Sequence, residues 1–301
     1  MALTKTTTQQ KGRVCFLSLD DVGLTYETDD HLAVAPLADL GWDVDFVSWR
    51  SNNKDVDWSV YNVVIIRSTW DYQDAPTEFK SVLRDIANLT RLENPLNIVE
   101  WNMSKQIYLP DLESKGVAVV PSLYSSAAIT PALFEDWKKH FDTDEIIIKP
   151  VIGASAGHTY RWKDLPTDLP IVFDGSLSYM VQPFMKRIVE EGEFSLFFFG
   201  GELSHVTIKN PKKGDFRVQE EHGGTNILLQ NPSKELLAAG EHALDMVGRT
   251  LLYARVDLVR TTSGKEEYLL MELELIEPSL YMRLDADAPK RFAQKIDEWL
   301  S

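Results

Sequence analysis

The sequence predicts an α/β protein that begins with a domain built on a parallel sheet. Short apolar runs at residues 14–19, 42–49 and 61–67 indicate strands, and helical patterns at 29–40 and 77–89 separate or follow them. Strands that alternate with helices are typical of βαβ units, whose strands run parallel. The later part of the chain adds further strand and helix patterns in a less regular order, which favours additional units behind the first.

Local signals set the bounds of the N-terminal elements. Asp29 or Asp30 caps the first helix, and Gly41 ends it, because glycine readily adopts the left-handed conformation that closes helices. Ligands of such sheets bind at the carboxyl ends of the strands. In this chain those ends carry polar and aromatic side chains, which are candidate substrate contacts: Asp20, Arg67, Trp70, Asp71 and Tyr72.

The later elements follow from the same reasoning. Helices are expected at 104–115, 134–141, 233–247 and 289–300. Strands are expected at 117–121, 146–150, 180–184, 253–259 and 269–276, with strands also dominating 194–209. The pattern is irregular around residues 93–102, so the first domain boundary is placed there. A chain of 301 residues can hold two or three domains, and we expect units at residues 1–100, 101–180 and 181–301.

Composition limits the functional classes. The formal charge of −15 argues against nucleic-acid binding, which needs a basic surface. Cys15 is the single cysteine, so an intrachain disulfide and a thiolate metal cluster are excluded, as expected in a reducing cytosol. The sequence contains no run of eighteen apolar residues, so no membrane span is predicted. Residues 1–10 lack the apolar core of a signal peptide. We expect a cytoplasmic protein without membrane partners. The sequence does not decide between a monomer and a homo-oligomer.

Three acidic residues interrupt two apolar strands near the C-terminus. Glu272 and Glu274 are two residues apart, so on a strand their side chains point to the same face. A hairpin signal around Gly264 places Asp257 on the neighbouring strand. Buried carboxylates need a cation between them, and a set of oxygen ligands suits a hard ion such as Mg²⁺. The pattern predicts a magnesium site, with an ordinary solvated strand face as the alternative.

The loop from Gly153 to Gly157 supports two functional interpretations. As G-x-S-x-G it matches the nucleophile elbow of a serine hydrolase, with Ser155 as nucleophile, but that motif needs a helix after the loop. Residues 158–162 instead indicate an extended segment. As a small-residue loop beside Lys149, it could cover phosphates with its backbone N–H groups. A plain turn is the third alternative.

Cations are concentrated at a few places in this acidic chain. Lys149 ends a strand of three isoleucines, which places its ammonium at a sheet edge, and Lys105 begins a helix. Residues 209–217 are basic, and Arg217 precedes Gly223 and Gly224. An arginine beside a glycine-flanked backbone is suited to a bidentate phosphate or carboxylate contact, whereas a solvated loop is the alternative.

Taken in order, these segments resemble the ATP-grasp superfamily. Residues 102–105 followed by 116–121 are similar to its opening N-x-x-x-K…G-[VI]-x-x-P pattern, and residues 148–157 to its second lysine and phosphate-covering loop. Residues 181–184 look like the hinge that binds adenine, and 214–224 like the Arg…Gly-Gly segment of glutathione-synthetase-like and RimK-like members. The amino-acid sequences of residues 67–72 and 271–280 are similar to those of a branch that includes the cyclo-ligase forming D-cycloserine from O-ureidoserine.

The resemblance implies a Rossmann-like N-terminal domain followed by two ATP-grasp subdomains that clasp the nucleotide. Arg217 and Lys149 are then the implied catalytic residues. The implied ATP contacts are Lys105, Lys149, Gly153, Ser155, Gly157, Gln182, Pro183, Phe184 and either Glu190 or Glu191. The implied ligands of Mg²⁺, or of Mn²⁺, are Asp257, Glu272 and Glu274. The resemblance also adds six residues to the candidate substrate contacts: Arg217, Gly223, Gly224, Glu277, Ser279 and Tyr281. Two residues depart from the family pattern: Glu274 replaces the usual Asn, and Glu277 stands where a small residue is common.

These implications define an ATP- and Mg²⁺-dependent carboxylate–amine ligase as the expected function. Such a ligase forms an amide or a cyclic amide from a small amino-acid-like substrate through an acyl phosphate. A serine hydrolase using Ser155 and a non-catalytic nucleotide-binding protein are the two rival hypotheses. The hydrolase would need no nucleotide, and the binding protein would never turn ATP over.

Overall fold

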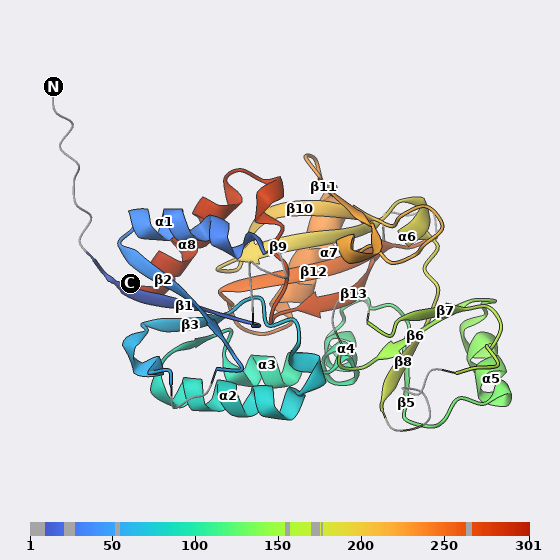
Figure 1. Cartoon of the computed structure of the whole chain (residues 1–301). Coiled ribbons are helices and arrows are strands. Elements are labelled where there is room, and N and C mark those ends of the chain that lie inside the picture. The colour runs from blue at the N-terminus through green and yellow to red at the C-terminus, as the bar shows by residue number, and fades with distance from the viewer. Residues whose placement is uncertain are drawn as a thin grey trace.

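Three β-sheets organise the chain (Figure 1). This computed structural model describes residues 10–20, 28–51, 55–153, 157–169, 175, 177–262 and 267–301. The predicted mixture of helices with parallel and antiparallel strands is confirmed. Short 3-10 turns connect some of the elements: η1 (Asp29–Ala33), η2 (Trp58–Val60), η3 (Tyr72–Asp74), η5 (Glu220–His222) and η6 (Met282–Leu284).

The N-terminal sheet is parallel, with the strand order β2-β1-β3-β4. Its strands are β1 (Gly12–Ser18), β2 (Trp42–Ser48), β3 (Val63–Ile66) and β4 (Leu92–Glu93). Its helices are α1 (Val34–Asp39), α2 (Pro76–Leu89) and α3 (Leu96–Asn102). Helix α3 lies in the segment that the sequence left irregular. Gly41 follows α1 with a φ of 95°, as a glycine closing a helix should.

The C-terminal helix completes this first unit. Helix α8 (Ala288–Leu300) packs against α1, and Phe292 stacks on Phe16 of β1 at 6.3 Å between ring centroids. Phe197 and Phe199 of the C-terminal sheet join the same apolar core. The last helix of the chain therefore ties the N-terminal sheet to the C-terminal one.

The central sheet is antiparallel, with the order β5-β8-β6-β7. Its elements are β5 (Leu123–Ser125), α5 (Pro131–Phe141), β6 (Ile146–Pro150), β7 (Tyr160–Trp162) and β8 (Tyr179–Pro183). The boundary placed at residue 180 falls inside β8. The strand expected at 117–121 is wrong: only Val119 forms a bridge there, to Leu270, because this stretch links helix α4 (Lys105–Ser114) to β5.

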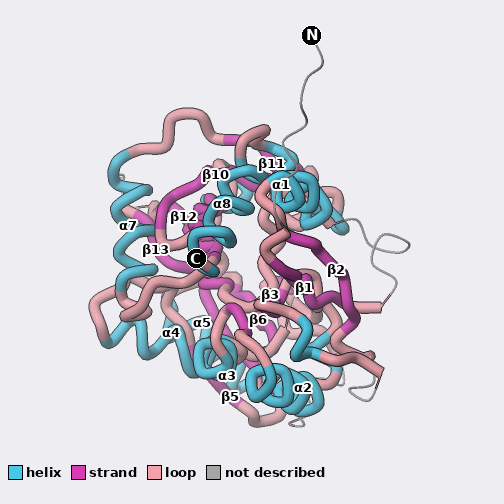
Figure 2. The backbone as a smooth tube through the Cα atoms, turned by 90° about the vertical axis from the view of Figure 1, so that its left-hand side faces the viewer, coloured by secondary structure: helices cyan, strands magenta, loops and turns pink. Residues whose placement is uncertain are grey.

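The C-terminal sheet is antiparallel, with the order β11-β10-β9-β12-β13. Its strands are β9 (Glu193–Phe199), β10 (Glu202–Asn210), β11 (Thr225–Leu228), β12 (Tyr253–Arg260) and β13 (Tyr268–Glu274). Helix α7 (Lys234–Asp245) packs on β12 and β13, as Figure 2 shows, and the short α6 (Arg187–Glu190) contacts β12. Helix α4 (Lys105–Ser114) lies between this sheet and the central one.

Candidate active site

One cavity is lined by residues from all three predicted units. Trp70 and Tyr72 reach it from the N-terminal unit, whereas Lys105 and Lys149 reach it from the central one. Sixteen of the predicted site residues line this cavity: Trp70, Tyr72, Lys105, Lys149, Gly153, Gly157, Gln182, Pro183, Phe184, Arg217, Asp257, Glu272, Glu274, Glu277, Ser279 and Tyr281. Segments that lie far apart in the sequence therefore share one wall.

Two lysines converge on one carboxylate in this cavity. Lys149, on β6, donates to Glu272 Oε1 at 2.5 Å. Lys105, at the start of α4, lies with its Nζ 3.6 Å from Glu272 Oε2 and donates to the Gly153 carbonyl at 3.0 Å. Burial alone would raise the pKa of Glu272, but the two ammonium groups lower it to about 2. Glu272 therefore stays ionised as the counter-ion of both lysines.

The backbone around Lys105 explains why this cation is held so firmly. The side chain of Asn102, at the end of α3, donates to the Leu273 carbonyl at 2.8 Å and accepts from the Leu275 amide at 3.0 Å. The Lys105 amide donates to Val151 just after β6, at 2.9 Å. The start of α4 is thus tied to both β13 and β6, the strands that carry Glu272 and Lys149.

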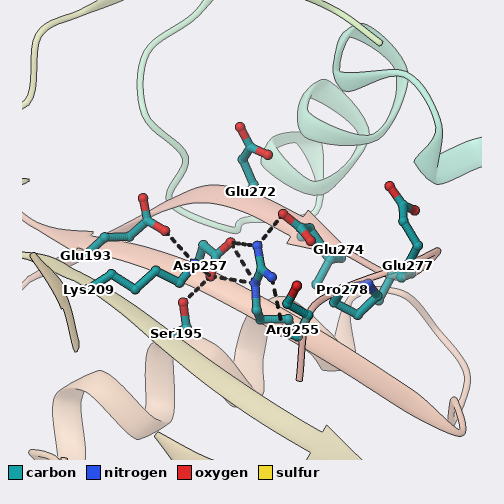
Figure 3. Close-up of polar contacts among 12 residues, drawn as sticks. Glu193, Ser195, Lys209, Arg255, Asp257, Glu272, Glu274, Glu277 and Pro278 are labelled. Atoms are coloured by element: carbon teal, nitrogen blue, oxygen red, sulfur yellow. Dashed lines mark hydrogen bonds and ion pairs between the residues drawn. The ribbon is translucent and has the colours of Figure 1, made fainter. Parts of the chain in front are cut away.

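A chain of buried charges lies beside Glu272 (Figure 3). Asp257 accepts from Arg255 Nε at 3.1 Å, from Lys209 Nζ at 3.2 Å and from the Ser195 hydroxyl. Lys209 also donates to Glu193 at 2.9 Å. Burial would raise the pKa of Asp257, but the two cations lower it to about 2.

Arg255 extends this chain to the second strand glutamate. Its guanidinium bridges Asp257 and Glu274, as the dashed lines in Figure 3 show. Arg255 was not among the predicted site residues, although it precedes Asp257 by two residues on the same strand and so shares its face. Lys209, Glu193 and Ser195 were not predicted either, because they meet Asp257 only across strand pairs.

The loop that follows β13 is fixed through its backbone carbonyls. Six successive carbonyls, from Leu275 to Leu280, each bond to a different side chain. In chain order these partners are Asn94 (2.7 Å), Tyr253 (2.8 Å), Trp70 (3.0 Å), Arg67 (2.7 Å), Arg255 (3.2 Å) and His205 (2.9 Å). We call this set the carbonyl clamp.

The clamp places the loop rigidly at the cavity wall. Two of its side chains, Arg67 and Trp70, were predicted as substrate contacts. Burial lowers the pKa of His205 to about 4, so near neutral pH its ring is uncharged, with Nε2 donating to the Leu280 carbonyl.

Several predicted residues lie outside this cavity lining. Arg67 is buried and pairs with Asp30, with its Nε 2.9 Å from Oδ1. Asp71 accepts from Arg50 and Trp49, both at 2.6 Å. The others in this group are Asp20, Glu190, Glu191, Gly223 and Gly224. None of these seven residues lines the cavity.

The two acids expected among the ATP contacts pair with other residues. Glu191 forms a bidentate pair with Arg260, at 2.6 and 2.7 Å. Glu190 lies 3.5 Å from Arg187 on the exposed side of α6. Glu193, two residues further on, is the acid of this segment that lines the cavity. Arg217 lines the cavity too, paired with Asp215 at 2.8 Å.

The predicted metal ligands are neighbours, but each has a protein counter-ion. Asp257 pairs with Glu272 across β12 and β13. Among the described residues, no three acidic, histidine or cysteine side chains come close enough together to hold a metal ion. The donor chemistry fits Mg²⁺, since all three side chains offer oxygen. To coordinate a cation, these acids would have to exchange partners.

The segment around the predicted serine nucleophile bears on the hydrolase hypothesis. Ser155 itself lies outside the described residues. The chain after the loop continues as β7 (Tyr160–Trp162), which pairs with β6. The extended segment predicted at residues 158–162 is thus confirmed for its last three residues, and strand β7 occupies the place where a nucleophile elbow needs a helix.

Comparison with known proteins finds relatives in sequence and in fold. The family model of the N-terminal domain of the D-cycloserine synthetase DcsG matches residues 14–94. The cycloserine biosynthesis protein DcsG of Streptomyces lavendulae is 27% identical over 304 residues, which cover 94% of this chain and 98% of that protein. The crystal structure of D-cycloserine synthetase DcsG superimposes with a TM-score of 0.80, at 24% identity, over 96% of this chain and all of that one.

A more distant structure shares the same architecture. The D-alanine–D-alanine ligase of Bacillus anthracis gives a TM-score of 0.66 at 12% identity, covering 96% of this chain and 97% of that ligase. The chain shares the fold of these ligases, and its end-to-end similarity to the DcsG synthetase indicates an ATP-dependent ligase. Within that class it is similar along its whole length to the D-cycloserine synthetase DcsG. Within the described residues, no helix has the length and apolar character needed to cross a membrane.

Proposed function

We propose that the protein is an ATP- and Mg²⁺-dependent carboxylate–amine ligase that acts through an acyl phosphate. The observation that carries this proposal is the convergence of Lys105 and Lys149 on Glu272 within the shared cavity. Two fixed ammonium groups from different elements are suited to hold adjacent phosphates, because preorganised charges need little rearrangement when the ligand binds.

Binding of ATP would exchange the partners of these charges. Lys105 and Lys149 would pair with the phosphates in place of Glu272. The Glu272 carboxylate would then become a magnesium ligand beside Glu274. Glu272 is already ionised, so it needs no proton loss for this exchange. Mg²⁺ would neutralise the phosphate charge when bound. Asp257, more firmly held by Arg255 and Lys209, would complete the ligand set.

The adenine would lie against the end of β8. Phe184, Met185 and Ile188 line this part of the cavity, and Arg161 covers Phe184 with its guanidinium carbon 3.6 Å from the ring centroid. Phe216 contacts Phe184 edge to face, with a centroid distance of 6.3 Å. These flat apolar surfaces suit a purine ring.

The remaining cations would support the transferred phosphoryl group. A substrate carboxylate attacks the γ-phosphorus, ADP leaves, and the acyl phosphate forms. An amine then attacks the acyl carbon, a C–N bond forms and phosphate leaves. Arg217 and Arg255 line the cavity where charge develops on the oxygens in both steps. The Gly153 loop would exclude water while the acyl phosphate exists.

The similarity to DcsG supports a serine-derived amino acid as the substrate. Since that relative is a D-cycloserine synthetase, O-ureidoserine is the first candidate, with intramolecular attack giving a cyclic amide. A second amino acid as the amine donor would give an ordinary amide instead. Either substrate belongs to the class of small amino-acid-like molecules.

Substrate-dependent ADP release tests this function. ADP release from ATP with O-ureidoserine, D-serine and D-alanine is expected to rise well above the rate without an amino acid. The Ser155→Ala variant is expected to keep most of this activity, since a ligase uses no serine nucleophile. Ester hydrolysis that disappears in Ser155→Ala, without any ADP release, would support the hydrolase. ATP binding without turnover on any substrate would support the nucleotide-binding protein.

A further inference from the structure

Glu277 is a buried carboxyl group in the cavity wall that forms no ion pair with any described residue. It follows β13 by three residues, and only 9% of its surface is exposed. Within the described part of the chain, no other side chain donates a hydrogen bond to its carboxylate, and it forms no ion pair. Every other acid labelled in Figure 3 is paired in the structure: Glu193, Asp257, Glu272 and Glu274.

The carbonyl clamp holds the backbone at Glu277 in place against the cavity. Trp70 donates to the carbonyl of Glu277 itself, and Arg67 donates to that of the next residue, Pro278. Both donors belong to the N-terminal unit, so the loop is held against it at this point. In Figure 3 the Glu277 carboxylate points to the same side as that of Glu272.

The charges around Glu277 do not neutralise it. The groups that face it are Glu274 from β13, Lys105 from α4, Arg255 from β12, and the phenols of Tyr72 and Tyr253. Burial raises the pKa of Glu277 to about 8, and the charge of Glu274 acts in the same direction. Lys105 and Arg255 lower the pKa only in part, because each is paired to another acid. Both phenols stay neutral, since burial raises their pKa.

A buried carboxylate without a paired cation is costly unless a ligand supplies that cation. We propose that Glu277 binds the protonated amino group of the substrate. This inference rests on the proposed ligase function, and it assigns to the substrate a free ammonium group that stays charged in the complex. The ammonium would donate to the Glu277 carboxylate, while the substrate carboxylate points toward the lysines and Arg255.

The proposal requires a proton to leave when the substrate binds. Near neutral pH, Glu277 is mostly protonated in the free protein, and a bound ammonium favours the charged carboxylate. Binding then converts the carboxylic acid into a carboxylate paired with the ammonium, and one proton passes to the buffer. Affinity for the amine should therefore increase with pH over the range in which Glu277 of the free protein loses its proton.

Calorimetry with D-serine and with D-glycerate tests this site. The two molecules differ at one position, where D-serine carries an amino group and D-glycerate carries a hydroxyl. Titrations use the full chain saturated with ADP and Mg²⁺, in PIPES and in Tris at pH 7, so that the number of released protons follows from the difference in heat. We expect D-serine to bind at least about tenfold more tightly than D-glycerate and to release nearly one proton. D-glycerate should release none.

The variant Glu277→Gln keeps the shape of the side chain and removes its charge. It should lose the preference for D-serine, the proton release and the pH dependence, while ADP–Mg²⁺ affinity stays at the wild-type value. Glu202→Gln is the matched control, because Glu202 is an exposed acid that pairs with Lys295 on the surface.

Two kinds of outcome would overturn the assignment. Equal affinity of the wild type for D-serine and D-glycerate would do so, as would an unchanged D-serine preference in Glu277→Gln. Loss of the magnesium effect on ADP affinity in Glu277→Gln would instead identify Glu277 as a metal ligand. Failure of the ligase function itself would look different, since ADP–Mg²⁺ would then not bind to the wild type.

Discussion

Replacing Lys149 by glutamine is expected to lower the turnover of ATP by about 100- to 1,000-fold. Lys149 lines the cavity with only 11% of its side chain exposed, and its Nζ contacts Glu272. In the proposed complex that ammonium moves to the phosphates, where negative charge builds up during transfer. The glutamine side chain can still donate one hydrogen bond, but it cannot neutralise charge. ATP affinity and substrate-dependent ADP release, measured on the same preparation, give both effects.

The control for this variant is Lys295→Gln. Lys295 also holds two acids, Glu202 and Glu298, but on the surface, so its loss should leave turnover unchanged. Turnover of Lys149→Gln close to the wild-type rate would mean that the phosphates lie elsewhere. Loss of turnover in both variants would point to a general effect of charge.

Replacing Arg67 by alanine is expected to lower the free energy of unfolding by about 3–5 kcal/mol. Arg67 is 1% exposed and pairs with Asp30, which is 2% exposed, so the variant leaves a buried carboxylate without its cation. The Pro278 carbonyl loses its donor as well, which loosens the carbonyl clamp. Urea unfolding followed by tryptophan fluorescence measures the change.

Arg84→Ala is the comparison for this effect. Arg84 pairs with Glu100 at 2.9 Å on the surface, with both side chains largely exposed, and such pairs contribute less than about 1 kcal/mol. If Arg67→Ala lost substrate binding at unchanged stability, Arg67 would be the substrate contact that the sequence predicted, and its role in holding the fold together would be wrong.

The sequence predicted most of the elements that position the site. The period-two spacing of Glu272 and Glu274 and the hairpin before them placed Asp257 on the adjacent strand, and the register of β12 and β13 confirms that pairing. The apolar run ending at Lys149 and the helix starting at Lys105 are likewise present as β6 and α4. Local patterns carry this information because they depend on residues close together in the chain.

Long-range partners could not be predicted in the same way. Arg67 and Trp70 lie at the carboxyl end of β3, as a substrate contact would, yet they donate to carbonyls more than 200 residues later in the chain. The pairing of Lys209 with Asp257 depends on the order of β10, β9 and β12 in the sheet. An apolar pattern reveals which face of a strand is buried, but not which strand becomes its neighbour.

The two strand glutamates and Glu277 have different surroundings despite their closeness in sequence. Glu272 is neutralised by two lysines, Glu274 by Arg255, and Glu277 by no side chain of the described structure. Their pKa values differ: that of Glu272 is lowered to about 2, whereas burial raises that of Glu274 and raises that of Glu277 to about 8. We infer that the three acids serve different ligands, with Glu272 and Glu274 assigned to the metal and Glu277 to the amino group.

Titration of ATP into the wild type and into Glu272→Gln, each with and without Mg²⁺, tests the proposed exchange of partners most directly. We predict that Mg²⁺ strengthens ATP binding to the wild type and that this gain disappears in Glu272→Gln. Binding without Mg²⁺ should be as tight or tighter in the variant, because Lys105 and Lys149 no longer have a competing carboxylate. An equal magnesium effect in both proteins, or no ATP binding to the wild type, would contradict the proposed exchange.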